Sequence, residues 1–174
     1  MKGTRITLPD AAVSDGDVLQ WTRQRWQLMD VPRAHTHSDL VLWQPETRTL
    51  IAAGLVYGLR LPELAQGSLL GWIAALDRLA ALRPVRVIGL QVGGPESIAR
   101  TRTYLCDLAA TVWEAMDRGL SASEAESLAL PSYRSWAGYR ERQPFNAQRA
   151  WRELEPLWMA GAPRPACSPP DVVR

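Results

Sequence analysis

The most constraining feature of this sequence is the order of its two hydrophobic patterns, because short strand-like runs come first and helical spacings follow. From position 5 to 57, extended runs rich in Val, Ile, Leu, Thr and Trp alternate with turn-forming Pro, Gly and Asp. Such alternation is typical of β-strands separated by turns. It predicts strands over residues 5–8, 18–21, 25–29, 39–43 and 49–56.

Two amphipathic helical patterns follow the strand-like region. The first begins after Ser68, a residue type suited to cap a helix, and its apolar residues recur three and four positions apart until Pro84. A short apolar run at 85–90 is consistent with a buried strand. The second pattern starts after Pro95 and ends at Gly119, which predicts a long helix between them.

Two further helices are expected in the last third of the chain. Ser121 and Glu124 have the spacing of a capping box, which predicts a helix that ends before Pro131. A fourth helical pattern opens at Asn146 and is limited by Pro156.

This order of elements predicts an α/β fold in which helices cover a largely antiparallel sheet. A chain of 174 residues, of which 47% are hydrophobic, has the size of one globular domain with a buried core. The segment from position 161 onward is rich in proline, so we expect it to be flexible or extended.

Composition argues against several classes of function. The 20 Lys and Arg residues are balanced by 18 Asp and Glu residues and are scattered along the chain, which disfavours a nucleic-acid partner. No window is apolar enough for a signal peptide or a membrane span, so we expect no membrane association and, by default, a cytoplasmic protein. Cys106 is interpreted as a small buried apolar residue, while the sequence leaves open whether it pairs with Cys167.

Three segments, in this order, resemble the second half of the metallo-β-lactamase fold. The segment 34–41, Ala-His-Thr-His-Ser-Asp-Leu-Val, is similar to a zinc-binding His-Thr-x-Gly-Asp loop of that family. The segment 49–57 resembles the strand that carries an Asp bridging two metals, and the segment 87–95 resembles the strand that leads to a further His ligand. The resemblance extends from about residue 3 to about residue 104.

The resemblance implies one half of an αββα sandwich. It divides the chain into a half-domain at 1–118, a helical extension at 119–160 and a proline-rich tail at 161–174. The extension is similar to the tail of a bacterial branch associated with quinoprotein metabolism, which makes the periplasm the alternative location.

The chain departs from the family pattern at two metal-ligand positions. Gly54 stands where the family has the bridging Asp, and Gly93 stands where it has the last His. The first half of the family's fold, which supplies further ligands, does not fit into this length. Because a catalytic zinc needs three convergent protein ligands, the resemblance implies a degenerate site with no catalytic residue of its own.

His35, His37 and Asp39 are the remaining candidate ligands for a metal. Side chains two positions apart in an extended segment point to the same side, so all three could face one zinc ion. In the alternative interpretation, the two histidines are solvated loop residues and Asp39 orients the turn.

Two functions are compatible with this resemblance. A half-sandwich leaves one sheet face uncovered, and we expect Leu40, Leu42, Leu50, Ala52 and the Trp side chains to contribute to that face. The chain would then bind a copy of itself or a chain carrying the missing half, and would act by association or ligand binding. The alternative is a zinc-dependent hydrolase of ester, thioester or lactam-like bonds, with His35 as one ligand and the others supplied by a partner chain.

Overall fold

The computed structural model describes residue 3 and residues 7–167, which form a six-stranded mixed sheet and three α-helices. The strands are β1 Val18–Trp21, β2 Gln24–Pro32, β3 Ser38–Gln44, β4 Thr49–Ile51, β5 Arg86–Ile88 and β6 Val92–Gly93. The helices are α1 Leu69–Ala81, α2 Pro95–Asp117 and α3 Tyr139–Met159. The predicted fold class, an α/β domain with a largely antiparallel sheet, is confirmed.

The strands pair in chain order from β1 to β6, and only the β4–β5 pair is parallel. This pair is parallel because α1 carries the chain from the end of β4 back to the start of β5. The start of β3 and the ends of β4 and β5 therefore meet at one end of the sheet. We call it the His35 end, after the loop that precedes β3.

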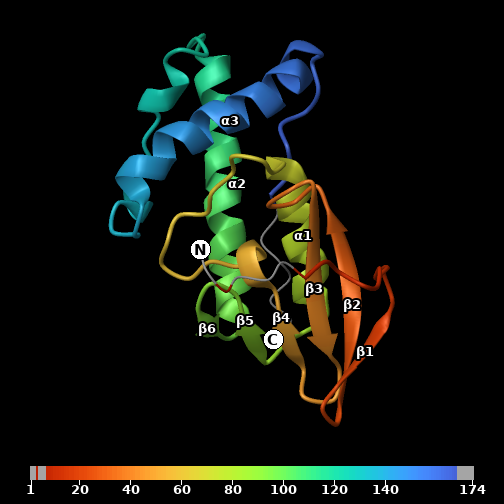
Figure 1. The fold of residues 1–174 in the computed structure, drawn as a ribbon. Helices are drawn as coiled ribbons and strands as arrows, with labels where there is room; N and C mark the ends of the chain where they lie inside the picture. Colours follow the sequence, from red (N-terminus) through yellow and green to blue (C-terminus); the bar gives the residue numbers. More distant parts are fainter. Residues whose placement is uncertain (1–2, 4–6, 168–174) are drawn as a thin grey trace.

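One face of the sheet is sealed by helices. The helices α1 and α2 lie side by side, and α3 crosses the end of α2 (Figure 1). Val41, Trp43, Leu50 and Val87 share the covered face, and none of them is more than 7% exposed. The buried core continues from this face into α3, where it reaches Leu154. The expected boundary at residue 118, between a half-domain and a helical extension, stays a prediction.

The opposite face, which we call the open face, carries an apolar row that crosses five strands. The strand register aligns one residue from each of the strands β2 to β6. In this order they are Leu28, Leu42, Ile51, Ile88 and Val92. Leu28 is buried, the next three are half-buried, and Val92 is 72% exposed. Leu40, on the same face of β3 as Leu42, is 48% exposed.

The expectation that Leu40, Leu42, Leu50 and Ala52 share one face is partly wrong. Trp43 pairs with Leu50, so Leu50 lies on the covered face, and Ala52 is buried beyond the end of β4. Alternation assigns faces within one strand, but the register between strands depends on the turn that joins them.

The strand boundaries also differ from the prediction at two places. The run 49–56 forms a strand only as far as Ile51, and Ala53–Leu55 form a short 3-10 helix. Residues 5 and 6 of the strand expected at 5–8 lie outside the described residues, and Thr7 and Leu8 are in no strand.

The helix expected after Ser121 does not form, although its capping contact does. The backbone N–H and the hydroxyl of Ser121 donate to Glu124 at 2.9 and 2.6 Å, and these hydrogen bonds hold the pKa of Glu124 below its usual value. Only the 3-10 helix Ala125–Ser127 follows. The run before Pro131 is too short to repay helix nucleation, and the carbonyl of Leu128 accepts a hydrogen bond from Gln143 instead.

The last helix is longer than predicted at both ends. It begins at Tyr139, after Gly138 turns the chain with a φ of 76°, and it includes Pro144 and Pro156. Each proline removes one backbone N–H donor from the helix. Because the helix nevertheless continues to Met159, Pro156 does not mark its end as predicted.

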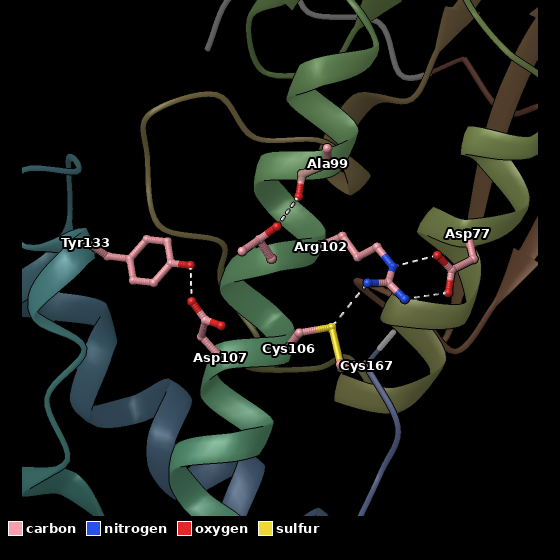
Figure 2. The surroundings of a disulfide bond; sticks show 8 residues. Asp77, Ala99, Arg102, Cys106, Asp107, Tyr133 and Cys167 are labelled. Carbon is pink, nitrogen blue, oxygen red and sulfur yellow. Dashed lines mark hydrogen bonds and ion pairs between the residues drawn. A yellow bond between two sulfur atoms is a disulfide. The ribbon is translucent and has the colours of Figure 1, made fainter. Parts of the chain in front are cut away.

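The two cysteines form a disulfide that ties the end of the described chain to the middle of α2 (Figure 2). Cys106 is buried, at 7% exposed, as expected, and the pairing with Cys167 that the sequence left open is present. The guanidinium of Arg102 lies beside this bond, 3.6 Å from the Cys106 sulfur, and binds both carboxylate oxygens of Asp77 at 2.5 and 3.2 Å. The segment 162–167 is without helix or strand, as expected, but it is held in place.

We predict that Cys167→Ser lowers the free energy of unfolding by about 2–4 kcal/mol, because the cross-link spans 61 positions and restricts the unfolded chain. Urea unfolding under non-reducing conditions measures this. Cys106→Ser and reduced wild-type protein should unfold at the same midpoint as Cys167→Ser. Two free thiols in the untreated protein would contradict the prediction.

Candidate functional site

The three segments that resemble the metallo-β-lactamase fold converge at the His35 end of the sheet. The N–H of Ala52 donates to Ile88 at 2.8 Å, and the N–H of Leu90 donates to Val56 at 3.0 Å. The carbonyl of Ala34 accepts from the N–H of Ser68 at 2.9 Å. The loop before β3 and the chain after β4 and β5 therefore form one site.

The His35 ring is packed inside this site. Its centroid lies 5.1 Å from that of Trp72 and 6.3 Å from that of Tyr57, and 27% of its side chain is exposed. The indole N–H of Trp72 donates to Leu55 at 3.0 Å, which fixes the ring against which His35 lies. Burial raises the pKa of the Tyr57 phenol above its ordinary value.

Asp39 holds the turn that precedes β3. Its two carboxylate oxygens accept from the N–H and the hydroxyl of Thr36, each at 2.9 Å. His35 Nδ1 lies 3.8 Å from Asp39 Oδ1. This arrangement agrees with the interpretation in which Asp39 orients the loop.

His37 is separated from this pair. It is exposed and lines a hollow of about 360 Å³ with residues that include Arg33, Arg149 and Glu153, whereas His35 does not line that hollow. Within residues 7–167, no three His, Cys, Asp or Glu side chains form a group that could hold a metal ion. Two donors do not fit a zinc centre, which takes at least three protein ligands. Zinc binding by His35, His37 and Asp39 together stays one of the two interpretations of this loop.

A side chain at position 54 would face the His35 ring. A Cβ at position 54 would lie 2.8 Å from His35 Nδ1 and 3.0 Å from its Cε1, closer than ordinary van der Waals contact. The imidazole thus fills the space that an aspartate at this position would occupy. The resemblance placed Gly54 and His35 at neighbouring ligand positions, and the structure brings them into contact.

Glu153, which no sequence pattern singled out, joins α3 to the start of α1. Its carboxylate accepts from the N–H groups of Leu69 and Leu70 at 2.9 and 3.0 Å and from the Ser68 hydroxyl at 2.8 Å. The predicted N-cap is confirmed, since Ser68 also accepts from the N–H of Gly71. A capping carboxylate 84 positions away leaves no local sequence signal.

No protein-family model and no curated protein matches this sequence. Among solved structures, a metallo-beta-lactamase from Pontibacter korlensis is 20% identical, with a TM-score of 0.52, over 57% of this chain and 50% of that one. The metallo-beta-lactamase family protein TTHA1429 from Thermus thermophilus is 16% identical, with a TM-score of 0.63, over 91% and 52% of the two chains. A double mutant of the sec-alkyl sulfatase PisA1 is 15% identical, with a TM-score of 0.64, over 84% and 27%.

The fold therefore resembles part of a metallo-β-lactamase-fold protein, which confirms the resemblance at the level of architecture. The chain spans about half the length of the first two similar structures. None of the described helices is both long and apolar enough to cross a membrane.

We predict that Gly54→Ala destabilises the protein by about 1–3 kcal/mol, because the added methyl group displaces the His35 ring from its packed position. In a His35→Ala background, the same change should cost clearly less. Thermal or urea unfolding of the four proteins in this double-mutant cycle measures the coupling. Equal costs in both backgrounds would show that the ring does not fill this space.

Proposed function

We propose that the chain acts as a metallo-β-lactamase-like half-domain that associates through its open face and does not hydrolyse substrate by itself. The apolar row on the open face supports this proposal most directly. A contiguous exposed apolar patch often marks an interface, and in sandwich folds two sheets pack face to face.

A second copy of the same chain is the proposed occupant of the open face. The similar solved structures are about twice as long as the matched region, so that region is only part of their fold. A copy of this chain offers another sheet with the same apolar row, and two-fold symmetry lets one patch bind its equivalent. The exposed side chains of Leu40 and Val92 would be covered in such a dimer.

We predict that the protein is a dimer at micromolar concentration. Leu40→Glu and Val92→Glu should each raise the dissociation constant of the dimer more than tenfold, because the new carboxylate would be buried in the interface. Sedimentation equilibrium or light scattering after gel filtration measures the mass. Both side chains are largely exposed in one chain, so the variants should fold normally.

The matched control for this experiment is Met159→Glu, since Met159 is 74% exposed but lies at the end of α3, away from the sheet. It should leave the dimer unchanged. A monodisperse wild-type monomer of native stability, or equal weakening by all three variants, would rule out association through the open face.

The second candidate function is a zinc-dependent hydrolase whose site is completed by a partner chain. It is favoured by the nearness of His35 and Asp39 at the end of the sheet where the three family-like segments meet. No step is assigned to these residues, because the donors within one chain do not fit the metal.

We predict less than 0.1 zinc per chain, and no hydrolysis of p-nitrophenyl acetate above buffer, after incubation with zinc and gel filtration, because a two-donor site holds zinc too weakly. Elemental analysis of wild type and His35→Ala measures the content. Zinc near one equivalent that is lost in His35→Ala would favour the hydrolase instead.

A further inference from the structure

A second hollow lies between the loop at 60–65 and the first half of α3. It has a volume of about 920 Å³, within the size range of sites for small organic ligands. Four arginines and two glutamates line it, an excess of two positive charges, together with Phe145, the only phenylalanine of the chain. We call it the arginine hollow.

Helical geometry produces the arginine wall of this hollow. Arg142, Phe145, Arg149 and Arg152 follow one another at intervals of three and four residues, so they lie along one stripe of α3. The opposite stripe of the helix, which includes Ala147, is buried in the core. The helix backbone that carries the arginines is therefore held in place by the core.

Two of the four guanidinium groups are held by the protein. Arg142 binds Glu63 at 3.1 Å, and Arg149 binds the carbonyl of Gly67 at 2.6 Å and Glu153 at 3.4 Å. Arg142 Nε is buried and has no hydrogen-bond partner among the described residues. These contacts fix the two side chains in position before any ligand arrives.

The other two guanidinium groups are available. Arg60 and Arg152 face the same hollow and form no ion pair with any residue in 7–167. Phe145 is 72% exposed beside them. Guanidinium groups bind carboxylate and phosphate oxygens in a bidentate way, and an exposed aromatic ring favours an apolar neighbour.

We propose that the arginine hollow binds a small organic oxyanion, with its carboxylate or phosphate on Arg60 and Arg152 and its apolar part on Phe145. The hollow is formed by a loop and α3, whereas the open face is formed by strands. The proposal is therefore independent of association through the sheet.

Calorimetric titration of the full chain with phenyl phosphate, benzoate and inorganic phosphate tests this proposal. Phenyl phosphate should bind, and Arg60→Ala and Arg152→Ala should each weaken it about tenfold, the usual effect of losing a hydrogen bond to a charged group. Phe145→Ala should weaken phenyl phosphate and leave inorganic phosphate unchanged. A comparison of phenyl phosphate with benzoate shows which oxyanion the hollow prefers.

The matched control is Arg140→Ala, because Arg140 is exposed on the same helix and does not line the hollow. It should bind phenyl phosphate as wild type does, and so should Leu40→Glu, whatever its state of association. The proposal is overturned if wild type binds neither organic anion below about 10 mM, weaker than the usual range for a specific site, or if Arg140→Ala weakens binding as much as Arg152→Ala. Unchanged binding in both Arg60→Ala and Arg152→Ala overturns it as well.

Discussion

The parallel pairing of β4 with β5 is the constraint on which the rest of this structure depends. It requires α1 as a crossover and brings the ends of both strands to the place where antiparallel β3 begins. Segments that are far apart in the sequence become neighbours there, and the N–H of Leu90 bonds to Val56. The metallo-β-lactamase-like architecture therefore depends on backbone pairing and not on side chains that would bind metal.

At the His35 end of the sheet, the His35 ring is part of the side-chain packing. His35 lies against Trp72, whose indole is anchored on Leu55, and its ring reaches toward Gly54. Because Gly54 has no side chain, the His35 ring fills the space beside it. Voids in a core reduce stability because the atoms around them lose contacts. A histidine that serves as packing and a histidine that serves as a ligand need different surroundings, and those of His35 are mostly aromatic.

Local patterns in the sequence predicted elements well and long-range relations poorly. Periodicity and the Ser68 cap predicted α1, and proline followed by apolar residues at helical spacing predicted α2. The pairing of Leu50 with Trp43 depends on a turn, and the capping of α1 by Glu153 depends on where α3 docks, so neither has a local signature. The same holds for the disulfide, since two cysteines separated by 61 positions carry no information about their distance. The three family-like segments were the exception, because the resemblance supplied the long-range arrangement that a single sequence lacks.

Helix α3 links the two surfaces for which roles are proposed. Its core stripe is buried with α2, its Glu153 caps α1, and its arginine stripe forms one wall of the hollow. Glu153 also pairs with Arg149, so the residue that joins α3 to the start of α1 also positions a lining arginine. α3 also packs on α2, which contacts β5, and Asn146 of α3 bonds to the backbone of Pro62 and Leu64, so several sets of contacts join the arginine hollow to the sheet.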